Sequence, residues 1–564
     1  MDITYFRHLS DSRYCFSLDE SHLLLRLAVS KYYPITDLEV IYGDPIRFSR
    51  EHYSQTLELK YEDQAYYYYE TIINIYPMRL TYIFKYKHED KDYYLCETDI
   101  YDGFDYSLSF LSAYQYDGEN KNDFIKEKSS WVGRVVYQIL PERFNYRKNV
   151  LDKSYVNKPW DTYPMKFGAS DFLGGDLYGV VDKLDYLLDL GISAIYLTPI
   201  HPSPTYHKYD VLDYFDVDPA FGGKEAFALL INEAHKRDIK IIMDLVYNHC
   251  SNQNPIFQDV IKNGKESKYY DWFFINGDKP VQKPCNYLCF STVSIMPKLN
   301  TNNKEVQEYL LKVAKYWVNE FHIDGYRLDA SEGVTHDFWN RFKIALTEIN
   351  PEILVIGENW LNSESYLGNN QFDGVMNYPF LSALSGYLLN KKDARETALH
   401  LQQLLMRYKD GHDRMMLNIY GSHDIQRAMN LVKDKDIALL GHAVMMFYIG
   451  YPMIYQGEEI FMEGGGDPDN RRGMKWDSKE FFSKQHQTLK ALIHLRKEKP
   501  LAIGDISFKY ENELLEIVRY KDDEQYRLIC NMTDKDIHID SDIIISNLYE
   551  DRILKSHGFV VSKE

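Results

Sequence analysis

The chain has 564 residues, more than one hydrophobic core usually serves, so its length predicts two or three domains. Its formal net charge of −19 argues against a nucleic-acid partner and against adsorption to anionic lipid, because both would require a basic surface. A neutral substrate is compatible with this charge. The 45% hydrophobic and 26% charged residues are ordinary for a globular protein with a substantial core.

Export, membrane insertion and disulfide bonding leave no sign in the sequence. Residues 1–6 lack a basic segment followed by an apolar run, so we expect no secretory signal and a cytoplasmic location. No apolar run reaches the roughly 20 residues of a membrane span, so no membrane partner is expected. Six cysteines are too few for a disulfide framework in so long a chain. At Cys285 and Cys289, two reduced thiols in a loop are favoured over a metal site.

The N-terminal part of the chain has the pattern of a β-sandwich. Residues 1–120 contain short alternating runs, such as 22–27 and 80–84, that are broken by Gly, Pro and Asp turns. The polar stretch 117–123 then predicts a linker to the next domain.

From residue 131 to 495, short apolar runs alternate with longer amphipathic segments, which indicates parallel strands joined by helical crossovers. Eight runs qualify as strands, the number that a closed (β/α)8 barrel requires. They are residues 135–140, 194–198, 240–245, 325–328, 354–357, 374–376, 415–419 and 453–455. We therefore predict an α/β fold, a (β/α)8 TIM barrel that follows the sandwich.

Two further segments complete the predicted architecture. An irregular stretch over about 250–300, after the third strand, predicts an inserted domain at the carboxyl face of the barrel, where long loops are usually functional. Short alternating runs over 500–564 predict a small C-terminal β-domain.

Carboxylates follow four of the predicted barrel strands, namely Asp244, Asp329, Glu358 and Asp424. Barrel enzymes carry their chemistry at these strand ends. Each acid alone would be interpreted as a turn former or a helix N-cap. Together they would repel one another at one concave site, a cost that a structural role seldom tolerates. The sequence therefore predicts an acidic active site.

Glycoside hydrolysis requires two carboxyl groups with unlike environments, one ionised and one protonated. Arg327 lies two residues before Asp329 on an extended strand and points to the same side, so we expect it to keep this nucleophile ionised. Glu358 has no cationic neighbour in sequence and lies near Trp360, which favours a raised pKa and the role of acid. His249 can donate hydrogen bonds to sugar hydroxyls, although a lone histidine is more often structural.

These segments, in this order, resemble the conserved regions of the α-amylase superfamily of glycoside hydrolases: residues 244–249, 327–329, 358–360 and 422–424. The resemblance implies that Asp329 is the nucleophile, Glu358 the acid/base and Asp424 a third acid that stabilises the distorted sugar. It also implies that Arg327 orients the nucleophile and that further residues line the site, namely Asp244, Asn248, His249 and His423.

Other motifs are similar to those of the cyclomaltodextrinase, neopullulanase and maltogenic amylase subgroup: residues 137–144, 174–177, 207–210 and 296–300. This resemblance implies an oligosaccharide or polysaccharide α-glucan substrate and a homodimer formed through the N-terminal module. It implies that Tyr209 stacks beneath the cleaved sugar and that Asp467 and Arg471 contact substrate. We add Trp360 to the predicted binding residues.

The chain departs from the subgroup at two places. After the nucleophile the subgroup usually reads Val-Ala-Asn-Glu, whereas this chain has Ala330-Ser331-Glu332-Gly333, so the balance between α-1,4 and α-1,6 cleavage is open. In the loop 145–149, cations at Arg147 and Lys148 disfavour calcium, and we expect no required cofactor. The alternatives are an α-glucosidase or oligo-1,6-glucosidase, and a non-catalytic sugar-binding homologue.

Overall fold

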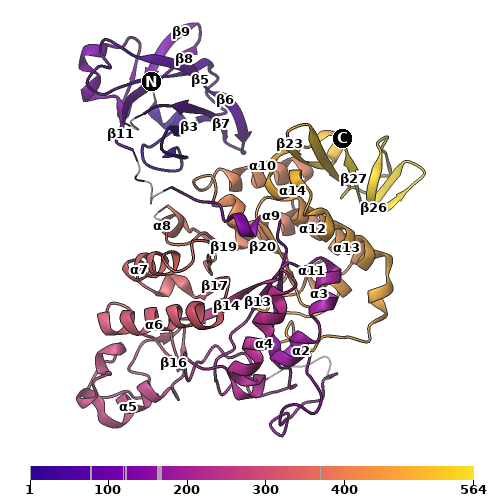
Figure 1. The fold of residues 1–564 in the computed structure, drawn as a ribbon. Coiled ribbons are helices and arrows are strands. Elements are labelled where there is room, and N and C mark those ends of the chain that lie inside the picture. Colours follow the sequence, from indigo (N-terminus) through magenta and orange to yellow (C-terminus); the bar gives the residue numbers. More distant parts are fainter. Residues whose placement is uncertain (1, 77–78, 119, 121–123, 162–167, 369) are drawn as a thin grey trace. The chain divides into compact units, whose positions relative to one another are not determined.

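A computed structural model describes residues 2–76, 79–118, 120, 124–161, 168–368 and 370–564 (Figure 1). The chain forms two compact units. The first comprises Met1–Glu127, Glu364–Asn370 and Arg395–Arg414, and the second comprises Lys128–Ser363, Gln371–Ala394 and Met415–Glu564. Two short segments of the central chain therefore belong to the N-terminal unit.

The N-terminal unit contains two antiparallel sheets that pack face to face. One has the order β1-β3-β7-β6 with β2 on β3, and the other has the order β10-β9-β8-β4-β5 with β11 on β8. Alternate residues of β3 and β8 fill the core, because successive side chains of a strand point to opposite faces. The strands are β1 Phe6–Arg7, β2 Cys15–Ser17, β3 His22–Ser30, β4 Thr36–Gly43, β5 Tyr53–Thr56, β6 Glu58–Glu62, β7 Tyr66–Asn74, β8 Leu80–His88, β9 Lys91–Leu95, β10 Ile100–Tyr101 and β11 Tyr114–Tyr116.

Eight parallel strands close into a barrel in chain order, since the last strand pairs with the first. They are β12 Val136–Ile139, β13 Ala194–Leu197, β14 Lys240–Val246, β17 Gly325–Asp329, β18 Leu354–Gly357, β19 Gly374–Asn377, β20 Leu417–Ile419 and β21 Tyr451–Tyr455. This confirms the predicted (β/α)8 fold. Nearly every strand residue is buried, which explains why the strands are continuous apolar runs in the sequence.

Helices of the second unit surround these strands in Figure 1, whereas α8 and nearly all of α10 belong to the first unit. Their ends follow local signals: α6 begins after Asn303, whose side chain accepts the Glu305 N–H, and ends where His322 adopts the left-handed conformation. The helices are α1 Pro141–Phe144, α2 Leu177–Val181, α3 Leu184–Leu190, α4 Gly223–His235, α5 Pro255–Asn263, α6 Lys304–Phe321, α7 His336–Thr347, α8 Glu364–Leu367, α9 Tyr378–Leu388, α10 Ala394–Leu405, α11 Ala428–Val432, α12 Lys435–Phe447, α13 Lys484–Leu495 and α14 Lys499–Ile503. None of the helices in the described part of the chain has the length and hydropathy of a membrane span.

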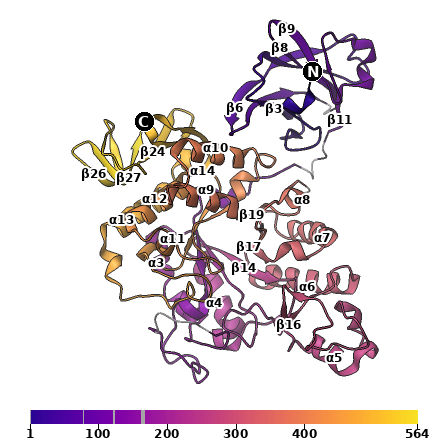
Figure 2. The same cartoon turned by 180° about the vertical axis from the view of Figure 1, so that it is seen from behind.

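Two smaller elements accompany the barrel. The segment after β14 contains α5 and a two-stranded sheet of β15 (Cys289–Phe290) and β16 (Val293–Pro297). The C-terminal sheet contacts α12, α13 and α14, and Figure 2 shows it beside these helices. Its strands are β22 Asp505–Lys509, β23 Leu515–Lys521, β24 Glu524–Cys530, β25 Ile537–His538, β26 Ile543–Glu550 and β27 Ile553–Lys563.

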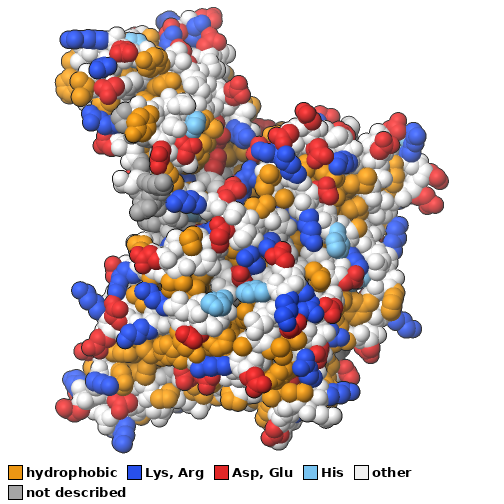
Figure 3. Space-filling view, viewed as in Figure 1, with side chains coloured by type: hydrophobic (Ala, Val, Ile, Leu, Met, Phe, Trp, Pro, Cys, Tyr) orange, Lys and Arg blue, Asp and Glu red, His pale blue; other side chains and the backbone are white. Residues whose placement is uncertain are grey.

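Positive and negative side chains are interspersed on the molecular face shown in Figure 3. Beneath the surface, a cluster of three ionisable side chains, Asp373, Lys343 and Lys128, is buried beside the barrel. Asp373 Oδ2 accepts the Val355 N–H at 2.8 Å, and its other oxygen pairs with Lys343 and lies 3.6 Å from Lys128 Nζ. Burial opposes ionisation, but the two ammonium groups hold the pKa of Asp373 below its ordinary value.

We expect Asp373→Asn to destabilise the protein by about 3–5 kcal/mol, because it removes the buried carboxylate that pairs with the ammonium groups of Lys343 and Lys128. Urea unfolding followed by circular dichroism measures this loss. Asp238→Asn is the matched control: it breaks the pair of Asp238 with Arg134, in which the Asp238 side chain is 84% exposed. A surface pair contributes about 1 kcal/mol at most. Equal losses in the two variants would contradict the prediction.

Candidate active site

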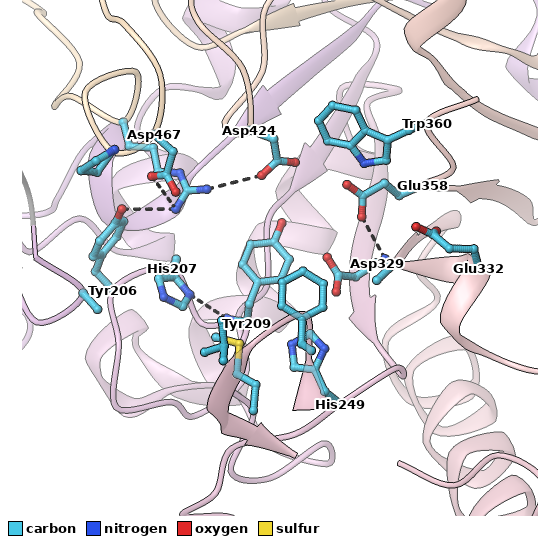
Figure 4. A pocket seen from close by; sticks show the side chains of 17 residues that line it. Tyr206, His207, Tyr209, His249, Asp329, Glu332, Glu358, Trp360, Asp424 and Asp467 are labelled. Carbon is cyan, nitrogen blue, oxygen red and sulfur yellow. Dashed lines mark hydrogen bonds and ion pairs between the residues drawn. The ribbon is translucent and has the colours of Figure 1, made fainter. Parts of the chain in front are cut away.

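A cavity of about 510 Å³ lies at the carboxyl ends of the barrel strands, a size that suits a small-molecule ligand. Figure 4 shows side chains from several barrel loops directed into it. Its lining residues are Ala169, Tyr206, His207, Tyr209, His249, Phe290, Val293, Met296, Asp329, Ala330, Glu332, Glu358, Trp360, Asp424, Asp467, Pro468 and Arg471.

The guanidinium of Arg327 joins the four predicted carboxylates. Its Nη1 lies 2.9 Å from Asp329 Oδ1 and 3.1 Å from Asp244 Oδ2. Its Nη2 lies 3.0 Å from Glu358 Oε2 and 3.6 Å from Asp424 Oδ2. The planar, two-pronged shape of the guanidinium allows one fully buried side chain to reach acids from four strands. The barrel thus gathers the carboxylates that the sequence placed at separate strand ends.

These contacts correct one expectation from the sequence. We expected Arg327 to keep Asp329 ionised, and the lack of a cationic neighbour in sequence to favour a raised pKa of Glu358, yet in the fold Arg327 contacts both acids. The reason is that β17 and β18 are adjacent, so Leu328 pairs with Gly357 directly before Glu358. The acid and the nucleophile are therefore not distinguished by proximity to Arg327.

Charge in this site is shared among the acids. Burial raises the pKa of Asp329 well above its ordinary range; Arg327 acts in the opposite direction, and the negative charge of Glu358 raises it further. Burial likewise raises the pKa of Asp244 to about 6, against the effect of Arg327. One guanidinium cannot neutralise four carboxylates. The raised pKa values of Asp329 and Asp244 follow from this excess of negative charge together with burial.

Ala330 holds Glu358 through its main chain. This residue directly follows β17 and adopts φ 41°, in the left-handed region that disfavours side chains. In this conformation its N–H donates to Glu358 Oε2 at 2.8 Å. Ser331 supports the same residue, since its hydroxyl donates to the Glu358 carbonyl at 2.7 Å. Strained backbone at such a position fixes the orientation of a functional side chain.

Arg471 fixes the opposite side of the cavity. Its Nε donates to the His423 carbonyl at 2.7 Å, and its Nη2 lies 3.4 Å from Asp424 Oδ1. Its Nη1 forms an ion pair with Asp467 Oδ1 at 3.1 Å. The loop after β21 thereby orients Asp424, as the dashed lines in Figure 4 indicate.

The loop after Asp329 has an unusual support. Lys298 Nζ donates to Asn248 Oδ1 at 2.8 Å and to the Gly333 carbonyl at 2.7 Å. A Cβ at Gly333 would lie 2.1 Å from Asn248 Oδ1, so only glycine fits there without displacement. These contacts hold the loop in place, and its acidic residue Glu332 lines the cavity.

Eight of the twelve site residues named from the sequence line the cavity, and four do not. Asp244, Asn248, Arg327 and His423 were expected to line it but lie behind the lining, with exposed fractions of 0 to 5%. They contact the lining residues instead: Tyr209 Oη, for example, donates to Asp244 Oδ2 at 3.0 Å. Asp244 and Arg327 lie within β14 and β17, whereas Asn248 and His423 lie in the loops that follow β14 and β20.

Sequence reasoning missed several lining residues. Phe290 and Val293 come from the irregular inserted segment, where no period relates one residue to the next. The ring centroid of Phe290 lies 4.8 Å from that of His249, which creates an apolar wall. Trp360 supplies another apolar surface and stacks on Tyr378 with ring centroids 4.1 Å apart. Aromatic walls of this kind suit the C–H faces of sugars.

No group of three or more His, Cys, Asp or Glu side chains in the described ranges has an arrangement that could hold a metal ion. Cys285 and Cys289 are both free thiols.

The comparisons with known proteins agree with this geometry. Residues 138–498 match the family described as "Alpha amylase, catalytic domain", and residues 1–108 match "Alpha amylase, N-terminal ig-like domain". A cyclomaltodextrinase of Thermoanaerobacter pseudethanolicus is 38% identical over 500 residues, which cover 87% of this chain and 85% of that protein. An intracellular maltogenic amylase of Bacillus subtilis is 38% identical over 448 residues, which cover 76% and 75%. A solved cyclomaltodextrinase structure matches with a TM-score of 0.89 at 30% identity, over 100% of this chain and 98% of that one.

Proposed function

Because this chain belongs to the α-amylase family of glycoside hydrolases, we propose that it hydrolyses the α-glucosidic bonds of cyclomaltodextrins and malto-oligosaccharides with retention of configuration. The observation that carries the proposal is the buried Arg327, which holds carboxylates from four barrel strands around one cavity. Retaining glycosidases use such acids as nucleophile and proton donor.

In the proposed reaction, Glu358 gives its proton to the glycosidic oxygen while Asp329 attacks the anomeric carbon. The bond to the leaving sugar breaks and a covalent glycosyl-enzyme forms. Glu358, now ionised, then takes a proton from water, whose oxygen attacks the anomeric carbon and releases Asp329. Two inversions restore the α configuration. Arg327 stabilises the carboxylate that leaves in the second step.

The neighbouring residues bind and orient the sugar. Asp424 accepts hydrogen bonds from hydroxyls of the distorted ring, and the Tyr209 ring supplies a stacking face. His249 and Arg471 donate hydrogen bonds, and Asp467 accepts them. Trp360, which lines the cavity, supplies a further apolar surface for a sugar ring.

A product profile on β-cyclodextrin, pullulan and soluble starch tests this function. We expect fast ring opening of β-cyclodextrin to maltose and glucose, and panose from pullulan if α-1,4 bonds of that polymer are cleaved. Proton NMR of the first product detects whether the α anomer forms. Faster cleavage of maltose or isomaltose than of β-cyclodextrin would favour an α-glucosidase or oligo-1,6-glucosidase. No hydrolysis of any substrate would indicate a non-catalytic homologue.

We also propose that activity requires no metal. Two carboxylates beside the loop 145–149 already have cationic partners: Lys153 Nζ lies 2.8 Å from Asp176 Oδ2, and Arg147 Nη2 lies 2.6 Å from Asp182 Oδ1. A calcium ion would have to displace these cations. Dialysis against EDTA should therefore leave kcat and Tm unchanged. A Tm that falls with EDTA and returns with calcium would contradict the proposal.

We further propose a cytoplasmic homodimer. The B. subtilis relative is named as intracellular, which supports the location. The N-terminal unit exposes Leu108, Phe110 and Leu111 together in one short segment, which supports association of this module. Sedimentation velocity should give a dimer that Phe110→Asp with Leu111→Asp converts to a monomer. A monomeric unmodified chain at micromolar concentration would exclude it.

A further inference from the structure

Gln138, on the first barrel strand, is fully buried and makes two hydrogen bonds with one residue. Its Oε1 accepts the main-chain N–H of His423 at 3.2 Å, and its Nε2 lies 2.8 Å from His423 Nδ1. We propose that Gln138 is a positioning residue that fixes His423 as the Nε2–H tautomer and so sets the direction of hydrogen bonds around the cleaved sugar. The link to catalysis rests on the proposed function; the tautomer does not.

The main chain determines which way the Gln138 amide points. The backbone N–H of His423 can only donate, so the side-chain carbonyl of Gln138 must face it. The amide NH₂ group is then the part that faces His423 Nδ1, and it can only donate. Nδ1 must therefore accept, which requires a lone pair there. This bidentate contact is selective in a way that a single amide–imidazole contact is not, because a flipped amide would set its NH₂ group against the main-chain N–H of His423 and lose that hydrogen bond with either ring tautomer.

His423 has one ring proton, and this proton is on Nε2. Burial lowers the pKa of His423 well below its ordinary value, and the positive charges of Arg471 and Arg327 lower it further, so the ring is neutral. Since Nδ1 accepts from Gln138, the proton of the neutral ring must reside on the other nitrogen.

The Nε2–H group faces the active site. It lies 2.5 Å from Tyr209 Oη and 3.2 Å from Asp424 Oδ1. Tyr209 Oη donates its own proton to Asp244 Oδ2 at 3.0 Å, so it is free to accept from His423. The two rings are stacked, with centroids 5.5 Å apart and planes 4° from parallel. Hydrogen bonds therefore run in one direction, from Gln138 through His423 and Tyr209 to Asp244.

The opposite tautomer would reverse this order. A lone pair on Nε2 would face the carboxylate of Asp424 and repel it. It would also attract the Tyr209 hydroxyl proton away from Asp244, which is already held by Tyr196 at 2.6 Å and by Arg327. The orientation of Tyr209 and Asp424, which both line the cavity, thus depends on a residue that does not line it.

Gln138→Glu tests the inference, because it replaces the amide donor that faces His423 Nδ1 by a carboxylate acceptor. A carboxylate accepts from Nδ1, so His423 should become protonated there, either as the Nδ1–H tautomer or as the cation. Long-range ¹H–¹⁵N spectra of the full-length enzyme labelled at histidine report the state of each ring nitrogen, with His423 assigned from its absence in His423→Asn. We expect a protonated Nε2 and an unprotonated Nδ1 in the unmodified enzyme, and a protonated Nδ1 in Gln138→Glu.

The loss of kcat/KM in each variant should parallel the change in the protonation of the His423 ring nitrogens. We expect Gln138→Glu to lower kcat/KM on β-cyclodextrin roughly tenfold to a hundredfold, the effect of one or two misdirected hydrogen bonds. Gln138→Met removes both contacts without reversing either and should populate both tautomers with a smaller loss. The matched control is Gln456→Met: the Gln456 side chain is equally buried in the barrel and bonds to main-chain groups of Leu140 and Arg143, and the main-chain hydrogen bond of Gln456 to Gln138 does not involve the side chain that is replaced. It should leave the His423 spectrum unchanged.

Failure of the inference differs from failure of the proposed function. An unmodified enzyme with an Nδ1–H tautomer would overturn the inference, as would a Gln138→Glu enzyme with unaltered spectra and kcat/KM. A chain that hydrolyses no α-glucan, yet shows the expected nitrogen states in both forms, would contradict the proposed function and leave the tautomer assignment supported.

Discussion

Asp329→Ala should lower kcat on β-cyclodextrin by about 10⁴-fold or more, because it removes the carboxylate that we propose forms the covalent bond to the sugar. The loss should not come from unfolding, since Asp329 ends a strand and its side chain faces the cavity. Azide added to this variant should fill the vacated space and attack α-maltosyl fluoride from the face that Asp329 occupied. The product should be the β-glycosyl azide, which NMR identifies from its anomeric coupling.

Asp467→Asn is the control for this substitution. It removes a charge from the same cavity, but from a side chain that is 49% exposed and paired with Arg471. We expect kcat to change by less than about tenfold. The nucleophile assignment would be excluded by near-normal turnover of Asp329→Ala, or by azide rescue that gives only the α product.

Glu358→Gln should lower kcat on β-cyclodextrin by about 10²–10⁴-fold, because the glucosyl leaving group then departs without a proton. Substrates with good leaving groups, such as α-maltosyl fluoride, need no proton and should form the glycosyl-enzyme at near-normal rate. This intermediate should accumulate and be visible as a mass increase on the protein. Gln preserves the acceptor for the Ala330 N–H, so the fold should be retained.

Azide should rescue this second variant with the opposite stereochemistry. It attacks the glycosyl-enzyme from the open face and should yield the α-glycosyl azide. The two variants together thus separate nucleophile from acid/base by product configuration, a readout that a general loss of stability cannot mimic. Equal loss of activity on fluoride and on β-cyclodextrin would speak against Glu358 as the proton donor.

The barrel could be predicted from sequence because buried parallel strands form continuous apolar runs with helices between them. All eight predicted strands lie within about two residues of the observed ones at both ends. The strand β20 begins at Leu417 rather than 415, because Asp413–Met415 form a short 3-10 helix. The ends of these apolar runs also predicted the strand ends, and therefore placed Asp329 and Glu358 at the carboxyl face of the barrel.

The depth of each side chain could not be predicted in this way. The sequence gives the order of Arg327 and Glu358 but not that adjacent strands bring them within 3.0 Å. The sequence also does not show that Tyr209 lines the cavity while His423, stacked on it, does not. Phe290 comes from a loop without periodicity, so its place on the cavity wall depends on long-range packing alone.

The glycine after Glu332 limits which sequences this loop can adopt. Because Gly333, Asn248 and Lys298 are in mutual contact, a side chain at position 333 becomes tolerable only together with a change at 248 or 298. The three positions are therefore epistatic. Gly333→Glu alone should therefore impair folding, whereas the same substitution combined with a smaller side chain at 248 should be tolerated.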